Sequence, residues 1–208
     1  MIGARKHGAA VRAFFAVEPG AAAREAAADV AARLRRAPLG EGVRWVRSEA
    51  YHVTLRFLGN VEIGKLPALC EAAAAAVAAR GPFVLELGAA RVLPSPRRPR
   101  VVVLELAPQA PLEALARRLE EVAVAQGFAP ERRAFRAHLT LGRVRHRRVP
   151  DVEGVAAAPG TQIPVQEVVL LRSDLEREGP RYTALERLPL EGEGGLLQRE
   201  AASRSHGC

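Results

Sequence analysis

Residues 51–59 read YHVTLRFLG, and a shortened form of this stretch returns at residues 137–143 as AHLTLGR. Both copies contain His-x-Thr-Leu, and their histidines, His52 and His138, lie 138 − 52 = 86 residues apart. Threonine stands at only four positions in the chain, so a count of the matches argues against a chance repeat. The repeat is the strongest pattern in the sequence, and it indicates two related strands.

Strand geometry gives this repeat a physical meaning. In a β-strand, residues i and i+2 share one face, so each imidazole is expected beside the hydroxyl of Thr54 or Thr140. Val53 and the leucines of the repeat then face the opposite side, where they can be buried against helices. Arg143 is expected to supply positive charge to the polar face, whereas Arg56 fits a solvated strand position equally well.

The chain around the repeat alternates strand and helix patterns. Clusters of β-branched and aromatic residues predict strands, and runs rich in alanine and leucine predict helices. Strands are predicted at residues 11–17, 43–46, 52–58, 83–87, 101–106, 138–144, 165–171 and 182–188, helices at 21–36, 66–79 and from 111 to a stop at Gly127, and a Pro/Arg-rich loop at 94–99. This order favours an α+β fold with largely antiparallel sheets.

The composition fits one moderate globular domain, residues 11–190, between flexible ends at residues 1–10 and 191–208. The chain has 208 residues, 49% of them hydrophobic, which excludes general disorder, and its net charge of +8 favours anionic partners such as RNA or phosphate. Cys70 and Cys208 are too few and too far apart to suggest a disulfide framework or a zinc cluster. No signal peptide or membrane span is indicated, so we expect a cytoplasmic protein.

The residue types in the repeat suit phosphoryl chemistry. Histidine has an ordinary pKa of about 6.5, so one imidazole can accept a proton while the other donates one. The hydroxyls of Thr54 and Thr140 can hold the non-bridging oxygens of a phosphate, and Arg143 can stabilise the charge that grows on it. A single strand histidine is more often structural, but two matched copies favour a site. Such chemistry needs no metal.

At these residues the sequence resembles the RNA 2′,3′-cyclic phosphodiesterase family, historically called 2′,5′ RNA ligases, of the two-histidine phosphoesterase superfamily. The resemblance extends beyond the two copies of the repeat and covers about residues 11–190. The further matching residues are RAFFAV at 12–17, Trp45-Val46, RAFR at 133–136, and Leu171, Ser173, Gly179 and Tyr182 near the end.

This resemblance implies a two-lobed, pseudo-twofold fold whose sheets form a central cleft, flanked by helices, that contains both histidines. It also implies hydrolysis of a terminal 2′,3′-cyclic phosphate on RNA to a 2′-phosphate, without a metal or another cofactor. His52 is then the proton donor to the leaving 3′ oxygen, and His138 is the proton acceptor that activates water. Ala137 departs from the family, where proline is common before the second histidine, but this change removes no reactive group.

Two aromatic roles and several functions stay open at this point. Phe14 and Tyr182 are candidates for stacking on a base, although core packing is favoured for Phe14 and is equally good for Tyr182. The expected partner is RNA with a 2′,3′-cyclic end, such as a tRNA fragment, and we expect a monomer. The alternatives are reversible 2′,5′ ligation of tRNA halves, opening of a small cyclic nucleotide, and RNA binding without catalysis.

Overall fold

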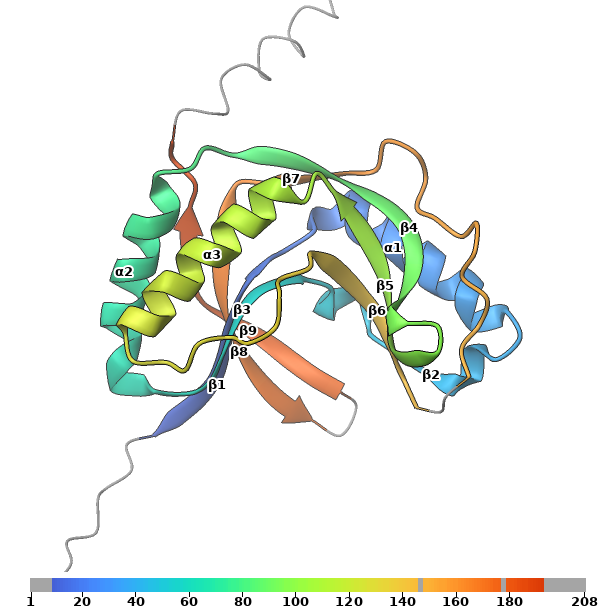
Figure 1. Ribbon diagram of the computed structural model, residues 1–208, viewed down its shortest axis with the longest axis horizontal. Helices are drawn as coiled ribbons and strands as arrows, with labels where there is room; N and C mark the ends of the chain where they lie inside the picture. The colour runs from blue at the N-terminus through green and yellow to red at the C-terminus, as the bar shows by residue number, and fades with distance from the viewer. Residues whose placement is uncertain (1–8, 146–147, 177–178, 193–208) are drawn as a thin grey trace, which may run out of the picture.

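The computed structural model describes residues 9–145, 148–176 and 179–192. Within these residues it contains two β-sheets that lie side by side and are flanked by helices (Figure 1). Cys208 and most of the two ends that were predicted to be flexible lie outside the described residues. The α+β class with antiparallel sheets, predicted from the order of elements, is confirmed.

Each sheet contains one copy of the repeat. The first sheet pairs antiparallel throughout, in the order β3 (Val53–Glu62), β1 (Ala10–Val17), β8 (Glu167–Glu176) and β9 (Gly179–Pro189). The second sheet is also antiparallel, in the order β2 (Val43–Trp45), β6 (His138–Val144), β5 (Arg98–Ala107), β4 (Phe83–Ser95) and β7 (Gln162–Val165). The repeat therefore occupies β3 and β6, in different sheets.

Two of the described α-helices pack on the sheet that does not contain the strand before them, and one packs on the sheet that does. Helix α1 (Gly20–Arg36) follows a strand of the first sheet but packs on β7, β6 and β4 of the second. Helices α2 (Leu66–Ala78) and α3 (Ala110–Ala125) pack on each other and on the first sheet, through β9 and β3 respectively. In the described part of the chain, none of the helices is long and apolar enough to cross a membrane.

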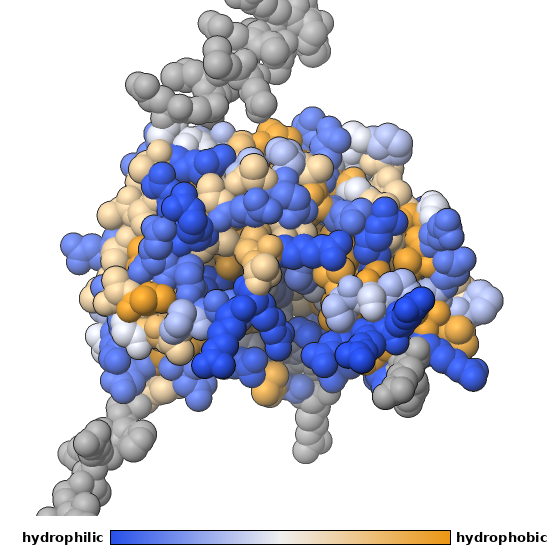
Figure 2. Space-filling model, viewed as in Figure 1, coloured by the Kyte–Doolittle hydropathy of each residue, from blue (hydrophilic) through white to orange (hydrophobic). Residues whose placement is uncertain are grey.

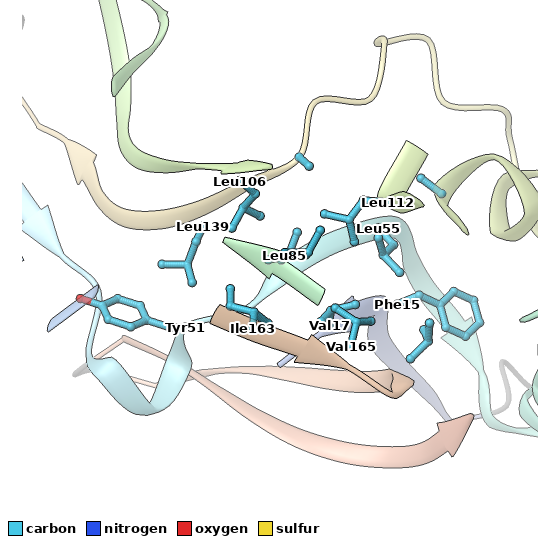
Figure 3. Packing of buried hydrophobic residues seen from close by; sticks show 14 of the residues in the cluster. Phe15, Val17, Tyr51, Leu55, Leu85, Leu106, Leu112, Leu139, Ile163 and Val165 are labelled. Atoms are coloured by element: carbon cyan, nitrogen blue, oxygen red, sulfur yellow. The ribbon is translucent and has the colours of Figure 1, made fainter. Parts of the chain in front are cut away.

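One hydrophobic core joins both sheets. Val53, Leu55, Leu139 and Leu141 are 0, 5, 0 and 0% exposed, so the side of each strand that was predicted to be buried is confirmed. Figure 3 shows Leu55 and Leu139 in the same cluster as Phe15 of β1. Because the apolar side of each repeat copy is buried in this core, the intervening polar residues are turned to the other side.

One strand predicted at residues 165–171 is two strands in the structure. β7 ends at Val165 in the second sheet and β8 begins at Glu167 in the first, so the chain changes sheets at Gln166. Val165 and Val168 are nevertheless both buried in the shared core. An apolar run indicates burial but not the strand with which it pairs, and for this reason the prediction of a single strand was wrong.

The loop predicted at residues 94–99 is the end of a long hairpin. β4 continues to Ser95 and β5 begins at Arg98, so the connection is shorter than the prolines suggest. Pro94 lies opposite Pro99 in the register, and at that position neither residue has to donate a hydrogen bond to the other. Residues 101–104 pair with residues 90–93 of β4, so the two strands stay paired almost to the turn.

Leu139 is fully buried at the point where the second repeat copy meets the core, so its truncation tests the core assignment. We expect Leu139→Ala to lower the free energy of unfolding by about 2–5 kcal/mol, because the lost contacts leave a cavity. Leu175→Ala is the matched control, since Leu175 is 77% exposed, and it should change stability by less than about 0.5 kcal/mol. Urea unfolding measures both, and equal effects would contradict the assignment.

Candidate active site

The two repeat histidines are held in the same way. His52 lies directly before β3, and its Nδ1 donates a hydrogen bond to the carbonyl oxygen of Ala50 at 2.8 Å. His138 opens β6, and its Nδ1 donates to the carbonyl oxygen of Arg136 at 2.7 Å. A carbonyl can only accept, so each bond places a proton on Nδ1 and leaves Nε2 as the nitrogen that can exchange a proton with a ligand.

The structure brings these histidines within electrostatic reach of each other and of Arg143. Strand β3 contacts β6, and the charge of His138 lowers the pKa of His52. The guanidinium of Arg143, exposed on β6, lowers the pKa of both imidazoles, and it acts against the larger effect of burial, which raises the pKa of the Tyr182 phenol. Residues 86 positions apart in the chain therefore share one electrostatic environment.

Burial is the largest influence on both histidine pKa values, and it lowers them. The backbone hydrogen bonds oppose this effect in each case, and Glu18 also raises the pKa of His52. The charges acting on His138, those of Arg136 and Arg143, both lower its pKa. Both imidazoles are thus biased toward the neutral form until an anion enters the site and favours protonation.

A β-bulge follows the threonine in each copy of the repeat. On β1, Ala16 pairs with Thr54 and the next residue back, Phe15, pairs with Arg56, so Leu55 is an extra residue in β3. The register between β5 and β6 shifts in the same way, which makes Leu141 the extra residue in β6. A bulge inserts one extra residue into a strand and so interrupts the alternation of side chains. Residues after the bulge therefore lie on the face opposite to the one that strict alternation predicts.

As a consequence, the residue directly after each bulged leucine points into the protein, and the residue after that one points toward solvent. Arg56 and Gly142 are buried, whereas Phe57 and Arg143 are exposed, again 143 − 57 = 86 residues apart. A Cβ at Gly142 would come within 2.4 Å of Val43 Cγ1, so the inward position of β6 has no room for a side chain.

The prediction that Arg56 fits a solvated strand position was wrong. Arg56 is 7% exposed, and its guanidinium forms an ion pair with Glu120 of α3. It also donates to the carbonyl oxygens of Phe57 and, at 2.6 Å, of Ala129. The bulge at Leu55 explains the error, because it turns Arg56 away from the histidines. Arg56 joins β3 to the segment before the second repeat copy.

Phe57 is a residue of the histidine face that the strand pattern missed. It pairs with Phe14 in the register, and the two ring centroids are 5.6 Å apart. The Phe14 ring in turn lies 4.9 Å from the His52 ring. Strict alternation would put Phe57 on the same face as the buried Val53. Alignment of the two repeat copies, which matches Phe57 with Arg143, was the one pattern in the sequence that could have identified it.

Phe14 and Tyr182, the two candidates for base stacking, both pack around His52. Phe14 is 2% exposed in a small cluster with residues of β8, which fits core packing and leaves little ring surface for a base. Tyr182 is half-buried, and its ring meets that of His52 edge-on at 4.9 Å and 82°. These contacts fix the orientation of the His52 imidazole.

Thr54 and Thr140 are half-buried on the polar side of their strands. Within residues 9–145, 148–176 and 179–192, neither hydroxyl has a hydrogen-bond partner, so both can bind a ligand oxygen. The described residues also contain no group of three His, Cys, Asp or Glu side chains placed to hold a metal ion. Figure 2 shows the surface hollowed between the two sheets, with strongly hydrophilic residues on both sides.

The LigT like Phosphoesterase family matches this chain twice, over residues 17–103 and 104–182. The two matches together cover most of the chain, and each contains one copy of the repeat. The chain belongs to this family. The resemblance found in the sequence is thereby confirmed, and the boundary between the two LigT-like matches separates His52 from His138.

Known LigT-like proteins agree with the assignment. The chain is 36% identical over 173 residues to the RNA 2′,3′-cyclic phosphodiesterase of Geobacillus stearothermophilus, covering 77% of this chain but only about half (55%) of that protein. It is 34% identical over 181 residues to the enzyme of that name from Methanothermobacter thermautotrophicus, covering 85% and 97% of the two chains. The crystal structure of E. coli LigT complexed with 3′-AMP matches with a TM-score of 0.73 and 29% identity, covering 88% and 99%.

Arg143 offers a direct test of the electrostatics of this LigT-like site. We expect Arg143→Gln to raise the pKa of both His52 and His138, because it removes a positive charge that disfavours their protonation. NMR titration of the imidazole Hε1 resonances measures the shift. Arg12→Gln is the control, since the Arg12 charge acts on Tyr182 but is not among the charges that shift either histidine. Unchanged histidine pKa values in Arg143→Gln would contradict the placement of this arginine.

Proposed function

We propose that this protein hydrolyses the 2′,3′-cyclic phosphate at the end of an RNA to a 2′-phosphate, by acid–base catalysis with two histidines and no metal. The observation that carries the proposal is the matched pair of Nδ1–carbonyl bonds, which leaves Nε2 of both histidines available. The names of the curated relatives support the activity, and the 3′-AMP complex of E. coli LigT supports a nucleotide ligand.

The proposed reaction is a displacement at phosphorus. Nε2 of neutral His138 accepts a proton from water as the water oxygen attacks, and the bond from phosphorus to the 3′ oxygen breaks. Nε2–H of protonated His52 donates its proton to that oxygen, which leaves a 3′ hydroxyl and a 2′-phosphate. The hydroxyls of Thr54 and Thr140 and the guanidinium of Arg143 hold the non-bridging oxygens and stabilise their charge.

The charges around the histidines favour this division of roles. Burial and Arg143 lower the pKa of both histidines, but Glu18 raises only that of His52, as a proton donor requires, and Arg136 lowers only that of His138, as a proton acceptor requires. The bound phosphate adds negative charge that favours protonation of His52. The positive charge of Arg143 also attracts the anionic substrate, which gives this residue two functions in the proposed mechanism.

Removal of either histidine tests the mechanism. With an oligoribonucleotide that ends in a 2′,3′-cyclic phosphate, in excess chelator, we expect His52→Ala and His138→Ala each to lower kcat by about 10²- to 10⁴-fold. Chromatography against authentic 2′- and 3′-phosphate standards identifies the product. Loss of wild-type turnover in chelator contradicts a metal-independent reaction, and a 3′-phosphate product contradicts cleavage at the 3′ oxygen.

The pH dependence separates the two roles. A proton acceptor must be neutral, so its titration makes the rate rise with pH, and a proton donor must be charged, so its titration makes the rate fall. We expect a bell-shaped profile of kcat/KM for the wild type. The residual activity of His138→Ala should lose the rising limb and that of His52→Ala the falling limb, and the opposite pattern would exchange the assigned roles.

A further inference from the structure

We propose that a pocket beside the histidines binds the nucleotide that precedes the cyclic end of the RNA. This inference rests on the proposed function and adds a second binding site to it. The pocket has a volume of about 440 Å³ and lies between residues 56–59 of β3 and residues 128–133 of the segment before β6. The first wall belongs to the first repeat copy, at 51–59, and the second wall shortly precedes the second copy, at 137–143.

The pocket lies next to the candidate active site. Phe57 lines it, and the Phe57 ring contacts that of Phe14, which contacts that of His52. Because Phe57 pairs with Phe14 in the register, the two side chains share the face on which His52 lies. When a phosphate is held at His52, the nucleotide next to it can therefore reach the pocket.

The lining residues have the chemistry of a single-stranded nucleic-acid site. Phe57 is 48% exposed, so its ring surface is open to a ligand, and an exposed aromatic ring stacks on any base. Arg132 and Arg133 are exposed, and among the described residues neither forms an ion pair. They outnumber the one acidic side chain of the lining, Glu131, which accepts a hydrogen bond from the Arg133 backbone N–H at 3.1 Å.

The two walls are tied together in the free protein. The buried guanidinium of Arg56 donates to the carbonyl oxygens of Phe57 on one wall and Ala129 on the other. Its partner Glu120 accepts the backbone N–H of Glu131 at 2.8 Å through its second carboxylate oxygen. A pocket that exists before binding costs less ordering entropy when a nucleotide enters it.

A comparison of substrates of different length tests the site. We would measure kcat/KM for a nucleoside 2′,3′-cyclic phosphate and for a trinucleotide with the same 2′,3′-cyclic end. The wild type should prefer the trinucleotide, and Phe57→Ala should reduce this preference by about 5- to 100-fold, the value of one stacked base. The double variant Arg132→Gln/Arg133→Gln should reduce it as well and weaken its dependence on salt.

Matched controls separate the pocket from general surface effects. Ile63→Ala removes a side chain that is 49% exposed just beyond β3 and outside the pocket, and Arg36→Gln removes an exposed positive charge at the end of α1. Both should keep the wild-type preference. The proposal is wrong if the wild type does not distinguish the two substrates, or if Phe57→Ala keeps the full preference.

A binding measurement distinguishes failure of this inference from failure of the proposed function. Fluorescence anisotropy with a labelled trinucleotide that carries a 3′-phosphate does not depend on turnover. Weaker binding to Phe57→Ala than to Ile63→Ala supports the pocket even if no cyclic phosphate is hydrolysed. Equal affinities for the two variants overturn the pocket, whatever the catalytic result.

Discussion

Burial of one side of two strands is the constraint on which the rest of this structure depends. Val53 and Leu55 on β3 and Leu139 and Leu141 on β6 enter a single core that both sheets share. A strand that buries alternate residues must present the others on its opposite face. The same apolar contacts that stabilise the fold therefore fix the direction of both histidines and both threonines, so the candidate site is built on rigid strands.

The two β-bulges add what alternation alone cannot provide. Each lies at the leucine of the repeat, and each brings the third residue after the threonine back to the polar face. In β6 that residue is the cationic Arg143, and in β3 it is the aromatic Phe57. The same kind of bulge, present in both strands, thus places a positive charge on one side of the candidate site and an apolar ring on the other, so the two repeat copies contribute different chemistry.

Arg56 illustrates how a buried charge can join the elements around such a site. Desolvation of a guanidinium is costly, and the ion pair with Glu120 and the bonds to two carbonyl oxygens offset that cost. These contacts join β3, α3 and the segment leading to His138. Burial first, and then the positive charge of Arg143, lower the pKa of both imidazoles, so that a bound anion can shift them toward the protonated form.

Local patterns in the chain were enough to predict most of the order of elements, the buried side of β3 and β6 and the family, because propensity, alternation and a repeated motif are properties of neighbouring residues. The same patterns allowed a solvated position for Arg56, missed Phe57 and merged β7 with β8. These features depend on which strand lies alongside: a bulge exists only relative to its partner, and an apolar run pairs with whichever sheet edge is near. Contacts between residues far apart in the chain fix them, and no local window of sequence contains those contacts.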